Sequence, residues 1–412
     1  MKAALCNLLV SALAVMLGGS ALVAQTFSSG SNGSDGALNF TGQTGTIVFD
    51  PASFNPPLDP DHDNVYHFTT ITIPSGLRVR LSADVLGVKP LVWLASGAVN
   101  IAGTLDLNGA TGHGFSESSI PAKAGAGGYM GGTGENESQS WKPGQGPGGA
   151  QSAGGGAGHA IMGGGLPPAT GGPPYGNDFL LPPVGGSGGA GGAFPGSGGG
   201  GGGGAIVIAS SVSISIAGSI SANGGDAGGA SSSTTAGGGG SGGAIRLIAP
   251  VIENTASNAS LSARGGHGYS FSGTGEASYG RIRLEAFQQK FTGGTIDPAP
   301  FFATPGPVFP PASAPSVRIV SIGGVSVPAN PTASFISPDV TLDNAATITI
   351  QLAGSKVPVG TVVHLTLTPE TGAIVNVDST PLAGTFDSST ATASVTIPHG
   401  FSRFSVQASW TP

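Results

Sequence analysis

Residues 199–229 read GGGGGGAIVIASSVSISIAGSISANGGDAGG, so a run of glycine changes abruptly into alternating aliphatic and serine residues. Because successive side chains of a β-strand point to opposite faces, this alternation places Val212, Ile214 and Ile216 on one face and serines on the other. A glycine then breaks the run before a last short strand at 219–222. The stretch therefore predicts three short strands joined by two corners.

The same pattern recurs elsewhere in the chain, although the last copy is only partly preserved. The copies begin, in order, at Pro90, Gly204, Gly243 and Gly280. Ile206, Ile245 and Ile282 occupy matching positions, 39 and 37 residues apart. Since one copy cannot close a core by itself, we expect successive copies to stack. The pattern indicates an all-β fold that begins with a right-handed parallel β-helix, a solenoid with a dry aliphatic interior.

Long glycine-rich segments separate the copies, and the longest spans 109–204. Glycine has no side chain, so such segments can pack backbone against backbone or adopt positive φ at turns. Three interpretations stay open at this point: disordered loops, ordered arms packed on the flank of the solenoid, and extended glycine helices bundled by backbone hydrogen bonds. The predicted fold class describes them as long glycine-rich loops.

The C-terminal part of the chain has a different composition. Residues 291–315 are rich in proline and phenylalanine, which predicts a stiff linker. Residues 316–412 contain five to seven strand-like segments separated by turn signals, and this spacing predicts an immunoglobulin-like β-sandwich. The apolar stretch at 1–24 is typical of a signal peptide. The remaining predicted domain, at 25–290, is the glycine-rich β-helix.

Composition limits the location and the partners of the protein. Glycine supplies 75 and proline 32 of the 412 residues, but charged residues are only 8%, so the chain is too apolar for simple disorder. Cys6 is the only cysteine and lies in the predicted signal peptide, which leaves the mature chain without disulfides. The formal net charge is −7 and no basic stripe is present, which argues against nucleic acid as a partner. No run of 18 apolar residues follows the signal peptide, so no transmembrane span is expected.

The copies resemble a known group of proteins. The segments SGAVNIAGTLDLNGATG at 96–112, GGGGGGAIVIASSVSISIAGSISANGG from 199, and GGSGGAIRLIAPVI at 239–252 look like glycine-rich secreted bacterial proteins, many of them adhesin-like and uncharacterised. The resemblance covers about residues 38–290. It implies a right-handed β-helix and a location outside the cell or on the outer envelope of a bacterium. The outer-membrane barrel, sorting motif and very long repeat arrays of such adhesins are not visible here, so the mode of surface attachment is not implied.

Parallel β-helices also carry polysaccharide lyases and hydrolases, which makes a carbohydrate-active enzyme the alternative function. Such a site needs grouped carboxylates, or carboxylates beside Arg or Lys, on one face. Asp106 lies on the outward face of its strand, and Arg246 and Arg283 are placed to stack in adjacent coils near Glu285. Asp106, Arg246 and Arg283 are therefore the candidate ligand-surface residues, with a surface charge ladder as the other interpretation. We assign no catalytic or cofactor-binding residue.

The densest cluster of charge is DPDHDN at 59–64. Asp59, Asp61 and Asp63 alternate like the start of a calcium loop, whereas the sixth place holds Asn64 and the twelfth holds Thr70 instead of the expected Gly and Glu. A weak calcium site and a solvated turn both fit this pattern. Calcium is the only cofactor that the sequence suggests.

These observations favour a non-enzymatic structural or adhesive protein that is secreted or held at the cell surface. We expect it to present its glycine-rich surface to extracellular matrix or to polysaccharide. Whether the protein is an enzyme is left open by the sequence, although an enzyme is the less favoured interpretation.

Overall fold

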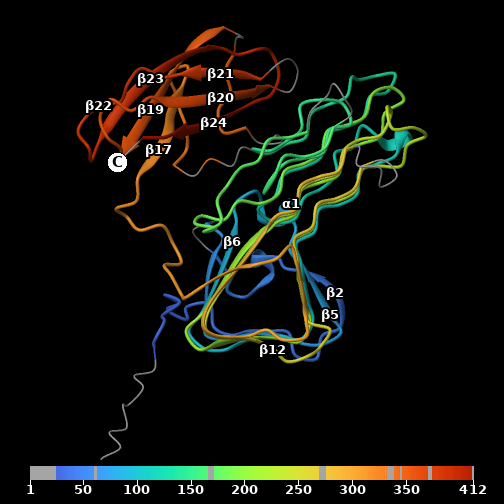
Figure 1. Cartoon of the computed structure of the whole chain (residues 1–412), viewed down its shortest axis with the longest axis vertical. Helices are drawn as coiled ribbons and strands as arrows, with labels where there is room; N and C mark the ends of the chain where they lie inside the picture. The colour runs from blue at the N-terminus through green and yellow to red at the C-terminus, as the bar shows by residue number, and fades with distance from the viewer. Residues whose placement is uncertain are drawn as a thin grey trace, which may run out of the picture.

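The structure is a computed structural model, and it describes residues 25–59, 63–165, 171–268, 275–329, 331, 338–343, 346–369 and 374–410. The predicted signal peptide at 1–24 and Asp61 lie outside the described residues. Figure 1 shows a stack of parallel strands, a glycine-rich bundle that projects from one corner of the stack, and a group of antiparallel strands near the C-terminus. Helices are short: α1 (Ala83–Leu86) and the 3-10 turns η1 (Pro51–Ser53) and η2 (Phe115–Glu117). No helix in the described ranges is long and apolar enough to cross a membrane.

Two parallel sheets form the stack. The ten-stranded sheet consists of β1 (Leu38–Asn39), β3 (Val65–Phe68), β4 (Ile71–Ile73), β6 (Leu91–Ala95), β7 (Val99–Ile101), β9 (Ala205–Ser210), β10 (Ser213–Ile216), β12 (Ala244–Asn254), β14 (Arg281–Lys290) and β16 (Phe301–Ala303). The six-stranded sheet consists of β2 (Gly45–Val48), β5 (Leu77–Arg80), β8 (Thr104–Asp106), β11 (Ser219–Ser221), β13 (Ser260–Ser262) and β15 (Thr295–Asp297). Strands of successive copies are therefore neighbours, as the repeat requires.

Aliphatic ladders run through the interior of this stack. Ile245 on β12 lies opposite Ile206 on β9 and opposite Ile282 on β14, and all three side chains are fully buried. The predicted alignment of these three residues is confirmed. Burial of each such side chain contributes about 1.5–3 kcal/mol, so the ladders are the main source of stability in this part of the molecule.

The predicted fold class, a right-handed parallel β-helix with glycine-rich loops followed by an immunoglobulin-like sandwich, is wrong. The ten-stranded sheet follows the path β1-β4-β7-β10-β12-β9-β6-β3. Its two end strands, β1 and β3, both come from the N-terminal part of the stack, so the sheet nearly closes on itself as a parallel barrel. β12 causes this closure because it pairs with β9 through Ala244–Ile248 and with β10 through Val251–Asn254. The two rows of strands, which the prediction kept separate, are thus one sheet.

A local difference between copies explains the closure. In the second copy the hydroxyl of Ser210 accepts hydrogen bonds from the backbone amides of Val212 and Ser213, at 3.1 and 3.0 Å, and these bonds make a corner. The matching place in the third copy lies beside Pro250, inside a strand of 11 residues. Because no serine hydroxyl is available there to accept the amides, β12 runs through the position where a corner was predicted.

The glycine-rich segments are not loops. Residues 197–205 donate backbone hydrogen bonds of 2.7–3.0 Å to three neighbouring segments in strict rotation. Those from Gly198, Gly201 and Gly204 go to His113, Ala110 and Leu107; those from Gly199, Gly202 and Ala205 go to Gly132, Tyr129 and Ala126; those from Ser197, Gly200 and Gly203 go to Thr235, Gly238 and Ser241. Every third residue therefore faces the same neighbour.

A period of three residues per turn is that of the extended polyproline II helix, here built from glycine. The segments thus form a bundle of glycine helices joined by backbone hydrogen bonds, the third of the interpretations left open by the sequence. Close approach explains the composition: a Cβ on Gly202 would lie 1.9 Å from the carbonyl oxygen of Gly186, and one on Gly243 would lie 1.8 Å from that of Gly204. No other residue fits at such distances.

Two antiparallel sheets form the C-terminal part. The larger has the order β18 (Val325–Ser326), β17 (Ser316–Ile322), β19 (Thr347–Ser355), β23 (Ser389–Thr396), β22 (Ala383–Gly384). The smaller has the order β21 (Val375–Asp378), β20 (Val363–Pro369), β24 (Ser402–Ala408). A small core that includes Ile350, Leu352 and Leu365 joins them.

The immunoglobulin-like prediction rested on strand spacing alone, and the pairing differs from it. An immunoglobulin constant-type domain has sheets of four and three strands. Its smaller sheet consists of strands C, F and G, and G is the last strand of the domain. Here the sheets have five and three strands, and β24 is the last strand of the described residues, with β21 on the far side of β20. Spacing along the chain indicates how many strands exist but not which of them pair.

Candidate functional site

The carboxylates of the candidate calcium loop bond to their own turn. Asp59 accepts the amides of Asp63 and Asn64 at 2.9 and 3.0 Å, and Asp63 accepts the amide of Val65 at 2.9 Å. Burial raises the pKa of Asp59, which disfavours its charged form. Within the ranges described, no three side chains of the metal-binding kinds gather into a group. Asp61 falls outside those ranges, so the calcium site stays a prediction.

Asp106 does not present a free carboxylate to a ligand. It lies on β8, is 4% exposed, and accepts hydrogen bonds from Arg78 at 2.9 Å and from Arg80 at 3.0 Å. Both arginines come from β5, the neighbouring strand, where Arg80 is directly opposite Asp106. The sequence placed Asp106 on the outward face of its strand, but the basic residues of the next layer cover it.

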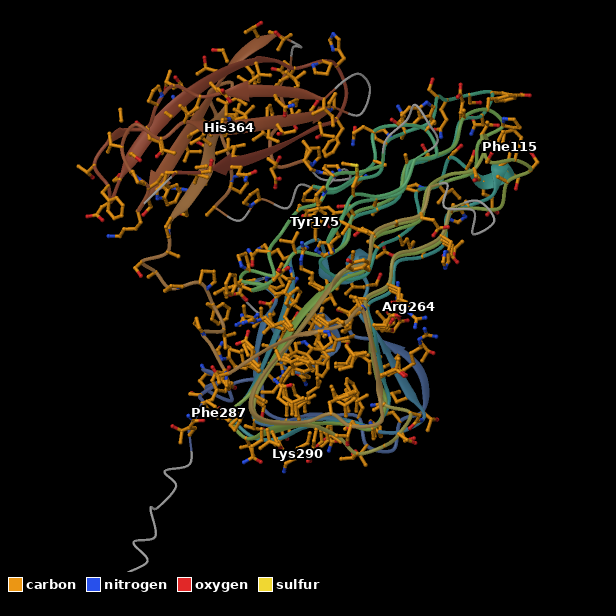
Figure 2. All side chains as sticks on the ribbon, viewed as in Figure 1. Phe115, Tyr175, Arg264, Phe287, Lys290 and His364 are labelled. Atoms are coloured by element: carbon orange, nitrogen blue, oxygen red, sulfur yellow. The ribbon has the colours of Figure 1, made fainter. Side chains whose placement is uncertain are left out.

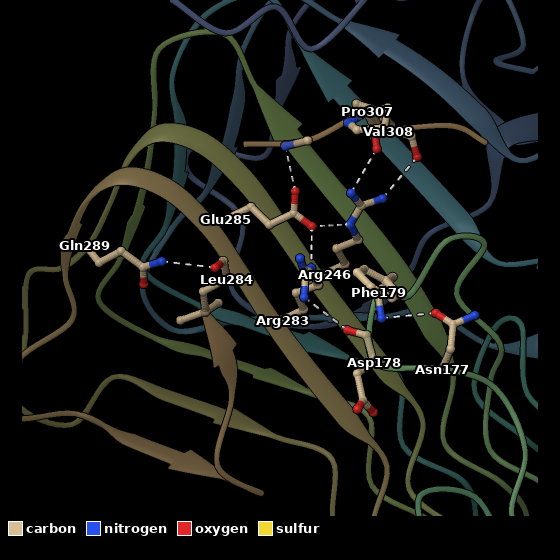
Figure 3. Close-up of polar contacts among 11 residues, drawn as sticks. Asn177, Asp178, Phe179, Arg246, Arg283, Leu284, Glu285, Gln289, Pro307 and Val308 are labelled. Carbon is tan, nitrogen blue, oxygen red and sulfur yellow. Dashed lines mark hydrogen bonds and ion pairs between the residues drawn. The ribbon is translucent and has the colours of Figure 1, made fainter. Parts of the chain in front are cut away.

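Arg246 and Arg283 lie opposite each other on β12 and β14, beside Glu285, as the repeat predicted. They do not form an open basic row. Figure 3 shows that Glu285 accepts a hydrogen bond from the Nε atom of each arginine, at 2.8 and 2.6 Å. Burial alone would raise the pKa of Glu285, but these two hydrogen bonds, the charge of Arg246 and the amide of Gly306 together hold its pKa below the usual range.

The same cluster fixes the segment that leads to the C-terminal sheets. Arg246, which is 2% exposed, donates to the carbonyl oxygens of Pro307 and Val308 at 2.8 and 3.2 Å, and Glu285 accepts the amide of Gly306 at 2.8 Å (Figure 3). Buried charges of this kind are stable only when every partner is in place. Arg246 and Glu285 therefore anchor the linker, whereas Arg283 is held by Glu285 and by the carbonyl oxygen of Asp178.

A second buried cluster supports the base of the glycine bundle. His159 stacks on Tyr175 with ring centroids 4.6 Å apart and planes at 9°, and its Nδ1 atom lies 2.5 Å from the carbonyl oxygen of Gly242. Arg281 donates to the carbonyl oxygens of His159 and Tyr175 at 3.3 and 2.8 Å. Burial lowers the pKa of His159 to about 4, so this histidine is neutral at physiological pH. Figure 2 places Tyr175 in the part of the bundle near the stack.

The far end of the bundle exposes aromatic side chains, and we call Phe115, Phe194 and Ile120 the tip. Figure 2 shows Phe115 at this end. Phe115 and Phe194 are 43% and 53% exposed and meet edge to face, with ring centroids 5.8 Å apart at 89°. Ile120 is 48% exposed. The amide of Phe194 donates to Glu135 at 3.3 Å, which ties a third segment to the tip.

The tip was not predicted from the sequence, because Phe115 and Phe194 are far apart in the chain and the glycine-rich residues between them show no periodic pattern. The only available signal was the appearance of phenylalanine at the ends of glycine runs, as in GHGF at 112–115 and GGAF at 191–194. Each such phenylalanine follows a glycine helix outward and marks the point where the chain turns back. Single exposed apolar side chains are common in this chain, so it is the contact between two exposed rings that distinguishes the tip.

Two cavities lie near β24. The larger, about 680 Å³, opens beside the two antiparallel sheets, and its lining includes Pro331 and Pro338, on either side of residues that lie outside the described part of the chain. The smaller, about 200 Å³, lies where the glycine bundle meets β24 and has Arg403 in its wall. Arg403 lines both cavities, and only the smaller one also borders the glycine bundle, through residues such as Gly131 and Thr133.

Comparison with known proteins gives no relative from which a role could be transferred. No family model matches the chain, no curated protein matches it, and no solved structure matches it.

Proposed function

We propose that this protein is a secreted or cell-surface binding protein that attaches to extracellular matrix or polysaccharide through the tip of its glycine bundle. The apolar stretch at 1–24 supports the location, because it has the pattern of a signal peptide. The observation that carries the proposal is the exposed aromatic pair at the tip, Phe115 with Phe194.

The tip combines an aromatic anchor with a rigid support. Aromatic side chains dominate the energetics of binding surfaces because they bury a large area and lose little rotamer freedom. The glycine helices behind the tip are bonded to neighbours on several sides, so binding would require little further ordering of the backbone. Only 8% of the chain is charged, which favours contact through rings and hydrogen-bonding groups over long-range attraction.

The alternative, a carbohydrate-active enzyme, is supported less well. Its candidate residues were Asp106, Arg246 and Arg283, and each of them is engaged in ion pairs with its neighbours. Catalytic use of Asp106 would require two arginines to release it. A binding role needs no such rearrangement.

The test is the double substitution Phe115→Ala and Phe194→Ala, measured as adsorption to a panel of immobilised polysaccharides and extracellular-matrix proteins. We expect binding at least tenfold weaker, because loss of a central aromatic contact costs about 2 kcal/mol or more. Phe179→Ala is the matched control, since Phe179 is 68% exposed but lies beside Arg283, away from the tip.

Three results would contradict the proposal. The first is that wild-type protein adsorbs to no surface of the panel. The second is that the tip variant binds as well as wild type, or that Phe179→Ala weakens binding equally. The third is that purified protein releases sugar fragments from a polysaccharide with turnover, which would favour the enzyme.

A further inference from the structure

Arg403 occupies an unusual position where the glycine bundle meets β24. The carbon atom of its guanidinium lies 5.5 Å from the ring centroid of Tyr129 and 5.6 Å from that of Phe401. Tyr129 belongs to the bundle and Phe401 immediately precedes β24, so the two rings come from different parts of the molecule. Contacts of this type use the flat faces of the guanidinium and leave its edge of N–H groups available.

The edge of this guanidinium is poorly satisfied by the protein. Nη2 donates to Oε1 of Gln145 at 3.3 Å, a long hydrogen bond, and Nε is buried with no partner. A guanidinium carries five N–H donors, and among the described residues this one makes a single long hydrogen bond to a protein side chain. Burial lowers the pKa of Arg403, whose side chain is partly buried between the bundle and β24. A cation withdrawn from water in this way is stabilised by an anionic partner.

The cavity of about 200 Å³ adjoins this arginine. Its wall includes a second cation, Lys142, and the polar side chains of Ser119, Thr133, Gln139, Gln145 and Thr368. The hydroxyl of Thr133 is also buried without a hydrogen-bond partner. At roughly 30 Å³ for each water molecule, the space equals that of about seven waters, which is enough for one small ring and too little for an oligomer.

We propose that this cavity binds a single acidic sugar unit, with its carboxylate on the edge of Arg403. The planar guanidinium matches a carboxylate with two parallel hydrogen bonds, and charge-assisted bonds of this type are the strongest available to the site. The amides of Gln139 and Gln145 and the hydroxyl of Thr133 are suited to the ring hydroxyls. The inference does not rest on the tip, because no residue of the tip lines the cavity.

The test is calorimetric titration of the full chain with glucuronate, with glucose as the uncharged counterpart and inorganic phosphate as an anion without a ring. We expect glucuronate to bind at least tenfold more tightly than either. Arg403→Lys keeps the charge but loses the fork, and should weaken glucuronate binding at least tenfold. Gln139→Ala should weaken it a few-fold while leaving the Arg403 environment intact.

Each outcome is informative. If glucose binds as tightly as glucuronate, the carboxylate is not recognised; if phosphate binds as tightly, the sugar ring is not recognised. Either result overturns the proposal. A wild-type protein that binds none of the three ligands overturns it as well. If Arg403→Lys fails to fold, the affinity of Gln139→Ala for glucuronate decides, and an unchanged affinity would overturn the proposal. The variant with Phe115→Ala and Phe194→Ala should bind glucuronate normally, so failure of the tip proposal and failure of this one are distinguishable.

Discussion

The parallel-strand stack and the glycine bundle are both closely packed, by opposite means. In the stack, fully buried side chains such as Ile206, Ile245 and Ile282 fill the interior between sheets. In the bundle, backbone packs against backbone, and the place where a Cβ would stand is already occupied by a carbonyl oxygen. The stack is therefore destabilised when a buried side chain is removed, whereas the bundle is destabilised when a side chain is added.

The two regions should also differ in local stability. Glycine loses more conformational freedom on ordering than any other residue, and the bundle buries little side-chain area in return. Its stability must come from the many backbone hydrogen bonds, each worth about 1 kcal/mol net. We therefore expect the bundle to open before the stack, which amide hydrogen exchange can resolve region by region.

The largest effect should come from the stack. Ile245→Ala removes a side chain that is enclosed between two other isoleucines, and the neighbours cannot move to fill the space because the ladder continues on both sides. The free energy of unfolding should fall by about 4 kcal/mol. Denaturant unfolding with amide hydrogen exchange measures this; a loss under 1 kcal/mol would show that the interior is loosely packed.

A somewhat smaller effect should come from the bundle, with the opposite chemistry. Gly202→Ala would place a Cβ 1.9 Å from the carbonyl oxygen of Gly186, so the two helices must separate. Overpacking of this kind should cost about 3 kcal/mol, seen as faster hydrogen exchange in the bundle and little change in the stack.

Gly229→Ala is the matched control for that substitution. Gly229 is exposed, has no atom within 4 Å of its Cβ position, and lies in the same glycine-rich part of the chain. The change should be neutral or slightly stabilising, because alanine restricts the unfolded chain. If Gly202→Ala were as harmless as Gly229→Ala, the backbone-packed bundle would be disproved.

The sequence correctly predicted the burial of Ile214 and Ile216, because a period of two residues encodes both a strand and its buried face, but Val212, placed on the same face, is 51% exposed at a corner. It could not predict that β12 would join two rows of strands, since that depends on Ala249, beside Pro250, standing where the second copy has the corner-forming Ser210. The glycine helices were equally hidden. A period of three residues leaves no trace when nearly every position is glycine.

The sites were hidden for a related reason, which is distance along the chain. The stacking of Arg246 on Arg283 follows from the repeat, but the carbonyl oxygens that Arg246 binds lie about 60 residues later. Arg403 and Gln145 are separated by 258 positions and belong to different parts of the molecule. Residue types alone could suggest charge at these places, but not whether it is exposed, paired or buried.

The smallest effect concerns pH, and it tests whether the bundle unfolds separately from the stack. His159 is one of the few rings buried within the bundle, and burial lowers its pKa to about 4, with the hydrogen bond to Gly242 opposing that shift and the charge of Arg281 adding to it. A histidine in the unfolded chain has a pKa near 6.5, so below that pH the unfolded state binds a proton that the folded state refuses. The contribution of His159 to the free energy of unfolding should therefore be complete above pH 7, and the free energy should fall by about 2 kcal/mol between pH 7 and pH 5.

The loss should appear as faster hydrogen exchange in the bundle while the amides of the stack stay protected. His159→Gln should remove this part of the pH dependence, because glutamine does not titrate, even if it lowers stability at neutral pH. A pH profile that is unchanged in His159→Gln would mean that the histidine is reached by water in the folded state. Loss of protection in both regions at once would mean that stack and bundle are one cooperative unit, despite being packed by opposite rules.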